Sequence, residues 1–183
     1  MGIAISQRVQ RVKPSPTMAV TALAAELRAQ GRDIIGLGAG EPDFDTPEHI
    51  KQAAIDAIKA GQTKYTAVDG TVELRDAIRE KFQRDNGLDY ARDEILVSSG
   101  AKQSCFNVCI ATLNAGDEAV LPAPYWFSYP DMIKLAEAEP VIITASLKDG
   151  FKITPRALDA AITDKTRLMF LNSPSNPTGA AYT

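Results

Sequence analysis

The chain has 183 residues, of which 45% are hydrophobic and 23% are charged, and its formal net charge at pH 7 is −3. This length and composition are typical of a globular protein with its own core, which excludes the disordered and collagen-like classes. Acidic and basic residues are interspersed without a Lys/Arg block, which argues against nucleic acid or a membrane surface as the main partner.

The chain begins with a polar arm that extends to about Pro16. Its opening residues, MGIAISQRVQRVKPSP, contain no continuous apolar region and no cleavage pattern, and no later run has the length of a membrane span. We therefore expect a cytoplasmic protein. A helix is predicted over 17–30 with Gly31 as its stop, and 33–38 is predicted to be a short strand that breaks into a glycine-rich loop.

Two further helices are predicted before residue 90. The stretch Thr46-Pro47-Glu48 is typical of a helix start, because a hydroxyl can cap free N–H groups and proline suits the first helical position. That helix is expected to end near Gly61. The next is predicted from apolar residues at every fourth position over 74–82, and it is expected to end at Asn86-Gly87.

From residue 94 onward, short apolar runs alternate with helical patterns. The predicted strands are 94–99, 118–123, 140–145 and 167–172. The predicted helices are 100–114, 128–138 and 154–162. This alternation predicts an α/β fold, a three-layer α/β/α sandwich with a mainly parallel sheet. In such sheets ligands bind where strands end and helices begin.

Metal-binding chemistry is not expected from this sequence. Cys105 and Cys109 lie four residues apart on a predicted helix, and that spacing suits neither a zinc knuckle nor a redox pair. We expect both to be buried free thiols that act as small hydrophobic residues. The single histidine, His49, has no cysteine or second histidine near it in the sequence.

The stretch Ser98-Ser99-Gly100-Ala101-Lys102 joins a predicted strand to a predicted helix. Free backbone N–H groups, the positive end of the helix dipole and hydroxyl groups would together form an anion site, with phosphate as the first candidate. The spacing is not that of a P-loop. Taken alone, the stretch favours an ordinary strand-to-helix turn, in which Ser and Gly serve the geometry, over a phosphate site.

Three other stretches are compatible with ligand contact without deciding it. The GLGAGEP loop fails the dinucleotide fingerprint, because Asp43 stands where the third glycine is required, so it is either a tight turn or a close approach of backbone to ligand. Trp126 follows a predicted strand and could stack on a flat ring or pack in the core. Asn176, before Pro177, could present its amide to a ligand or only form a turn.

Taken together, five ordered motifs resemble the pyridoxal-phosphate-dependent aminotransferases of the aspartate aminotransferase superfamily, most closely the bacterial type. These motifs are GEPDFDTP, TKYT, SSGAKQ, PYWFSYP and NSPSNPTG. The resemblance runs through essentially the whole chain. It implies pyridoxal 5'-phosphate as cofactor, an amino acid and a 2-oxo acid as substrates, and a homodimer.

The resemblance assigns roles in cofactor binding. Gly100, Ala101 and Lys102 would surround the cofactor phosphate, in agreement with the anion site inferred from the turn. Trp126 would stack on the pyridine ring. Tyr65 would reach the phosphate bound by the neighbouring subunit.

It also assigns roles in substrate binding. Gly40 would lie against the substrate carboxylate, and Trp126 would offer its indole N–H to the substrate. Asn176 would bind the phenolic oxygen of the cofactor and help to hold the substrate carboxylate. Lys13 matches a position near the site entrance where relatives with prephenate activity also have lysine, although an exposed lysine of the arm is an equally good interpretation.

Backbone and domain features follow from the same resemblance. The peptide bonds before Pro124 and Pro177 are expected to be cis, a conformation whose free-energy cost is small before proline and large before other residues. Residues 1–45 would form an N-terminal arm and part of a small domain. Residues 46–183 would form the N-terminal part of a large cofactor-binding domain.

The resemblance places the lysine that holds the cofactor and moves the substrate proton beyond Thr183. We therefore expect no catalytic residue within the chain and no transaminase activity from these 183 residues alone. The parent enzyme is expected to use aspartate and 2-oxoglutarate, with a prephenate, aromatic or alanine aminotransferase as the alternative. A cofactor-sensing regulator would carry a helix-turn-helix, and none is evident in the sequence. A nucleotide-binding domain is disfavoured by the failed glycine fingerprints.

Overall fold

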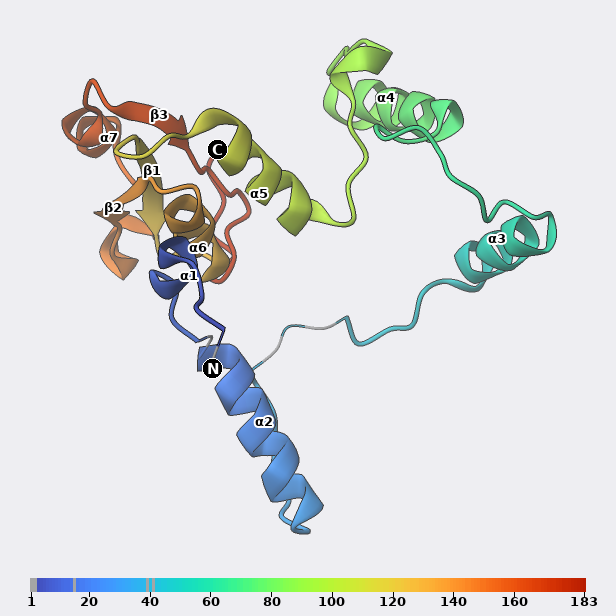
Figure 1. Ribbon diagram of the computed structural model, residues 1–183, viewed down its shortest axis with the longest axis horizontal. Helices are drawn as coiled ribbons and strands as arrows, with labels where there is room; N and C mark the ends of the chain where they lie inside the picture. Colours follow the sequence, from blue (N-terminus) through green and yellow to red (C-terminus); the bar gives the residue numbers. More distant parts are fainter. Residues whose placement is uncertain (1–2, 15, 39, 41) are drawn as a thin grey trace. The chain divides into compact units, whose positions relative to one another are not determined.

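The computed structural model describes residues 3–14, 16–38, 40 and 42–183, and the chain divides into two compact units (Figure 1). The first unit comprises Met1–Lys13 and Ser98–Thr183, and the second comprises Pro14–Val97. The predicted division into domains at residue 45 stays a prediction.

The first unit is built on a parallel sheet of three strands. These are β1 (Glu118–Ala123), β2 (Glu139–Thr144) and β3 (Thr166–Met169), in the order β2-β1-β3. The runs 118–123 and 140–145 are thereby confirmed as strands, and the run 167–172 is confirmed in part, because β3 ends three residues earlier than predicted. The central strand β1 is the most buried, as expected for a strand covered on both faces.

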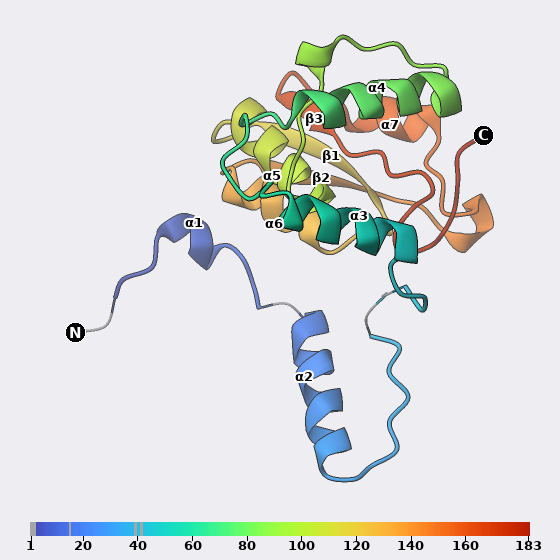
Figure 2. The same ribbon diagram turned by 90° about the vertical axis from the view of Figure 1, so that its right-hand side faces the viewer.

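Helices cover this sheet. They are α5 (Ala101–Thr112), α6 (Ser128–Leu135) and α7 (Pro155–Ala161), with a short 3-10 turn η2 (Leu147–Asp149). The short helix α1 (Gln7–Gln10) packs on α6. Helix α5 packs on α6 and β3, while α6 also contacts β1 and β2 (Figures 1 and 2). The connections through α6 and α7 run in opposite directions across the sheet, and right-handed crossovers therefore place these two helices on opposite faces. The expected α/β sandwich is confirmed.

A single apolar cluster fills the space between the sheet and the helices α5 and α6. Leu121 of β1 and Ile133 of α6 are essentially inaccessible to solvent, and Cys109 of α5 is completely buried. Tyr129 and Phe170 pack against this cluster from the edge where the strands end. The core therefore reaches the loops in which the predicted site residues lie.

The prediction of buried thiols is confirmed for Cys109 and only in part for Cys105. Both are free thiols, Cys109 fully buried and Cys105 half-buried. Burial raises the pKa of the Cys109 thiol to about 11, because the thiolate form would lose its hydration. Within the described ranges, no three side chains of His, Cys, Asp or Glu gather in a metal-binding arrangement. None of the helices described there combines the length and apolar character that a membrane span requires.

The second unit is helical. Its elements are α2 (Pro16–Ala29), α3 (Glu48–Lys59), α4 (Val72–Asn86) and the 3-10 turn η1 (Arg92–Glu94). Thr71 caps α4 by accepting a hydrogen bond from the backbone N–H of Leu74 at 3.2 Å, and Gly87 ends it in the left-handed conformation. The predicted cap of α3 is wrong by one residue, because Pro47 rather than Thr46 precedes the first turn, and no side chain caps that helix.

Two predicted strands of the chain are absent from the structure. Residues 33–38 form no strand, and Ile35 and Leu37 are 85% and 93% exposed. The Ile34 carbonyl instead accepts hydrogen bonds from the Arg28 guanidinium at 3.2 and 3.3 Å. Residues 95–98 form no strand either. One backbone hydrogen bond joins them to another segment, from the Val97 N–H to the Asp69 carbonyl at 3.0 Å. A strand requires a neighbouring strand to satisfy its backbone groups, and the described residues provide none for either segment.

Candidate functional site

Predicted site residues of the first unit lie on loops that follow the carboxyl ends of β1 and β3. Strand β1 ends at Ala123 and leads directly to Trp126, and β3 ends at Met169 and leads to the loop that contains Asn176. The start of α5 joins this group, because Lys102 contacts Trp126. This edge of a parallel sheet is where ligands of α/β proteins bind.

The loop after β1 holds Trp126 in an aromatic cluster. The Ala123–Pro124 peptide bond is cis, as predicted. The half-buried Trp126 indole meets the Phe127 ring at 5.8 Å and the Tyr129 ring at 5.3 Å between centroids, both in edge-to-face geometry. Tyr129 lies 4.7 Å from Phe170 in turn. This packing anchors the indole to the core, and burial raises the pKa of the Tyr129 hydroxyl.

The loop after β3 is organised by a residue that the sequence did not single out, Asn172. Its side-chain amide donates a hydrogen bond to the Pro174 carbonyl at 3.1 Å and accepts one from the Asn176 backbone N–H at 2.8 Å. The predicted cis bond before Pro177 is confirmed, and a second, unpredicted cis bond precedes Pro174. Asn176 itself is exposed, and its side-chain amide has no hydrogen-bond partner among the described residues.

The same loop is closed at its far end by Tyr182. The Tyr182 hydroxyl accepts a hydrogen bond from the Ile153 backbone N–H, and the Tyr182 N–H donates to the Ser173 hydroxyl, both at 2.9 Å. The Gly179 N–H donates to the Ser175 carbonyl at 2.7 Å. The backbone that carries Asn176 is thus held by hydrogen bonds on both sides. The abundance of Asn, Ser and Pro in NSPSNPTG indicates such a turn but not its bonding pattern.

The turn before α5 presents unpaired backbone donors. Gly100 has φ +85°, a conformation that suits glycine, and α5 begins at the next residue. No backbone hydrogen bond of the described chain uses the N–H groups of Ala101 and Lys102, as expected for the first turn of a helix. The Ser99 N–H is already occupied by the Gln103 side chain at 2.5 Å.

The donor set of this turn fits a phosphate group. The Ser98 hydroxyl oxygen is buried and has no hydrogen-bond partner within the described ranges, and such an orphaned group is unusual. The same turn supplies two free N–H groups and the positive end of the helix dipole, and residues 98–102 include Lys102 but no carboxylate. The binding of the cofactor phosphate by Gly100, Ala101 and Lys102 stays a prediction that these observations support.

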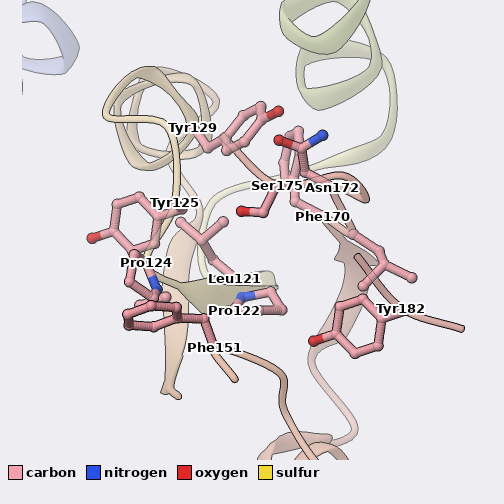
Figure 3. A pocket seen from close by; sticks show the side chains of 12 residues that line it. Leu121, Pro122, Pro124, Tyr125, Tyr129, Phe151, Phe170, Asn172, Ser175 and Tyr182 are labelled. Atoms are coloured by element: carbon pink, nitrogen blue, oxygen red, sulfur yellow. The ribbon is translucent and has the colours of Figure 1, made fainter. Parts of the chain in front are cut away.

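Two hollows border these residues. A groove of about 450 Å³ lies between α5 and α6 and includes Ser99, Lys102 and Phe106 in its lining, and its size is that of a small-molecule pocket. A second cavity lies at the ends of β1 and β3 (Figure 3) and measures only about 20 Å³, room for about one water. In Figure 3, Tyr125, Phe151 and Tyr182 surround this second cavity, which is therefore a packing gap rather than a cofactor pocket.

The remaining predicted site residues lie outside this cluster of contacts. Lys13 is exposed after α1, in the first unit. Gly40 and Tyr65 belong to the second unit, where Tyr65 is fully exposed and nothing lies within 4 Å of a Cβ built on Gly40. Their assignments to the substrate carboxylate and to the phosphate of a neighbouring subunit stay predictions.

Comparison with known families decides what this arrangement belongs to. The family model described as "Aminotransferase class I and II" matches residues 32–183, which include the glycine-rich loop, the turn before α5, Trp126 and Asn176. The chain belongs to the class I and II aminotransferase family. Members of this family depend on pyridoxal phosphate, and the donor set of the turn is compatible with that cofactor.

Individual aminotransferases are similar over almost the whole chain. The aspartate/prephenate aminotransferase of Nitrosomonas europaea is 60% identical over 178 residues, which are 97% of this chain and 45% of that protein. The crystal structure of the aspartate aminotransferase from Rhizobium meliloti is 54% identical, with a TM-score of 0.95 over 100% of this chain and 46% of that one. The Thermus thermophilus aspartate aminotransferase with maleate is 48% identical, with a TM-score of 0.95 over 100% and 48% of the two chains. The chain thus spans about half the length of these aminotransferases.

Proposed function

We propose that the protein is the cofactor-binding N-terminal part of an aminotransferase that transfers the amino group of L-aspartate to 2-oxoglutarate. The observation that carries this proposal is the similarity to the Rhizobium meliloti aspartate aminotransferase over the entire chain. The donor-rich turn, the anchored indole and the preorganised Asn176 loop support it independently, because each lies at the ligand-binding edge of the sheet.

Each part of the site would have a defined task. Pyridoxal phosphate, when bound, supplies an electron sink for the charge left on the substrate when its α-proton departs. The turn 98–102 would hold the phosphate, and Trp126 would support the ring from one face. Asn176 would donate its side-chain amide to the phenolic oxygen of the cofactor. Because Asn172 fixes the Asn176 backbone, this amide is presented with little loss of conformational entropy.

Substrate recognition and assembly belong to the same proposal. Maleate, named with the Thermus thermophilus structure, is a dicarboxylate like aspartate and 2-oxoglutarate, which supports dicarboxylic substrates here. Gly40 and Asn176 would lie against a substrate carboxylate. Tyr65, whose side chain is fully exposed, would reach the phosphate site of a second copy, so we propose a homodimer acting in the cytoplasm.

Prephenate is a second candidate substrate. The Nitrosomonas europaea and Cereibacter sphaeroides relatives, each 60% identical, are named aspartate/prephenate aminotransferases. Lys13 is exposed, and no ion pair of the described residues involves it, so its ammonium is free to meet a carboxylate of an incoming ligand. Prephenate presents two carboxylates, one of which would pair with this ammonium.

The test compares the full-length protein with its Lys13→Ser variant in transamination with aspartate as donor. We expect the unsubstituted full-length protein to be active with 2-oxoglutarate as acceptor. In the Lys13→Ser variant, the ratio of kcat/KM for prephenate to kcat/KM for 2-oxoglutarate should fall by about tenfold or more, because a charge-assisted hydrogen bond to prephenate is lost. Lys148→Met, at an exposed lysine of η2, serves as the control and should leave this ratio unchanged. No activity with aspartate would refute the main proposal, and an unchanged ratio in the Lys13 variant would refute the role of Lys13.

A further inference from the structure

Lys102 contacts the one tryptophan of the chain. Its Nζ lies 4.9 Å from the centroid of the Trp126 ring, within the range of a cation–π interaction. Lys102 is in the first turn of α5, whereas Trp126 is in the loop between β1 and α6. The contact therefore joins the donor-rich turn to the aromatic cluster.

The Lys102 ammonium has the Trp126 indole as its recorded partner among the described residues. Among the ion pairs of the described residues, none involves Lys102, although Asp131 lines the same groove. The Trp126 ring makes edge-to-face contacts with Phe127 and Tyr129. The ring is thus held by two aromatic neighbours, and the Lys102 cation is attracted to its electron-rich face.

We propose that Lys102 is a positioning residue for Trp126, and that its charge keeps the indole plane in one orientation at the edge of the sheet. This inference rests on the proposed function in one respect: the proposed function is what assigns Trp126 to support the cofactor ring. An indole fixed in advance loses less rotational freedom when a flat ligand stacks on it. Lys102 would thus serve both ends of the ligand, the phosphate at the turn and the ring at Trp126.

Fluorescence of Trp126 provides the test, because it is the single tryptophan of the 183 residues. Acrylamide quenching and near-UV circular dichroism would be measured on the protein without cofactor and on its Lys102→Met and Lys102→Arg variants. We expect Lys102→Met to raise the quenching constant by about twofold or more, the size expected when a cation–π contact is lost, and to weaken the near-UV signal. Lys102→Arg should restore both, because guanidinium also stacks on indole.

The control is Lys148→Met, which removes an exposed lysine of the same unit. Among the described residues, the cation–π contact of Trp126 is made by Lys102 and not by Lys148. It should leave both signals unchanged. Wild-type quenching in Lys102→Met, or a Lys102→Arg variant that behaves like Lys102→Met, would overturn the proposal, since either result makes the charge irrelevant. Far-UV circular dichroism must stay unchanged in all variants.

Cofactor binding is measured separately by calorimetry with pyridoxal phosphate. If Lys102→Met releases Trp126 while the wild-type protein binds no pyridoxal phosphate, the positioning role stands and the proposed function fails. If pyridoxal phosphate binds but Trp126 is equally mobile in wild type and Lys102→Met, the proposed function stands and the positioning role fails.

Discussion

Replacing Ala101 with aspartate is expected to weaken the binding of pyridoxal phosphate by about tenfold or more. Ala101 is the first residue of α5, and its own N–H is one of the two free donors of the turn. A carboxylate there would repel the phosphate dianion by at least about 1–2 kcal/mol at a separation near 4 Å. The same carboxylate stabilises a helix when it lies in the first turn, so protein stability should stay constant or rise.

Weaker binding together with unchanged or higher stability would distinguish the loss of a binding site from damage to the fold. Calorimetry would measure the affinity for pyridoxal phosphate and for pyridoxal, which lacks the phosphate, and thermal unfolding would measure stability. Ala101→Asn is the neutral control of nearly equal shape and should keep most of the affinity. The assignment of the phosphate to this turn fails if Ala101→Asp binds pyridoxal phosphate as tightly as wild type does, or if it weakens pyridoxal to the same extent.

Replacing Leu121 with alanine is expected to lower the free energy of unfolding of the first unit by about 2–5 kcal/mol. Leu121 is 1% exposed on the central strand, within the main apolar cluster. It also lines the small cavity at the end of β1 (Figure 3), so the lost methyl groups would enlarge an existing void. Both the lost transfer free energy and the larger cavity destabilise the fold.

Trp126 lies in the same unit, so its fluorescence during urea unfolding reports this change. Leu147→Ala is the matched control, because Leu147 is 76% exposed in the same unit and its truncation should change stability by about 0.5 kcal/mol or less. Equal effects of the two substitutions would show that the sheet is not the stabilising core that the burial pattern indicates.

Local sequence patterns were sufficient for most of the first unit. The run EAVLPA is apolar and bounded by turn signals, and it forms β1 over the residues predicted. The predicted helices of both units also appear, because helix stop signals act locally: in the second unit, Gly87 ends α4 in the left-handed conformation. The two cis bonds predicted before Pro124 and Pro177 came from family resemblance rather than from local pattern, and both are present.

Long-range pairing could not be predicted from local pattern. Residues 33–38 have the composition of a strand, yet a strand also needs a neighbouring strand, and the described residues provide none for this segment. The role of Asn172 could not be predicted either, because it depends on the folded course of the loop. Any polar residue of the loop could cap it, and only the folded backbone shows that the Asn172 amide spans to Pro174 and Asn176. The Lys102–Trp126 contact joins residues 24 positions apart, beyond any local period.

The central claim is that the edge of this sheet is the cofactor site of an aminotransferase. A crystal structure of the protein grown with pyridoxal phosphate tests it most directly. The account predicts the phosphate at the Gly100 turn, against the free backbone N–H groups of Ala101 and Lys102. It also predicts the ring on the Trp126 indole and the Asn176 amide at the phenolic oxygen. A cofactor phosphate bound elsewhere, or a ring without contact to Trp126, would contradict it.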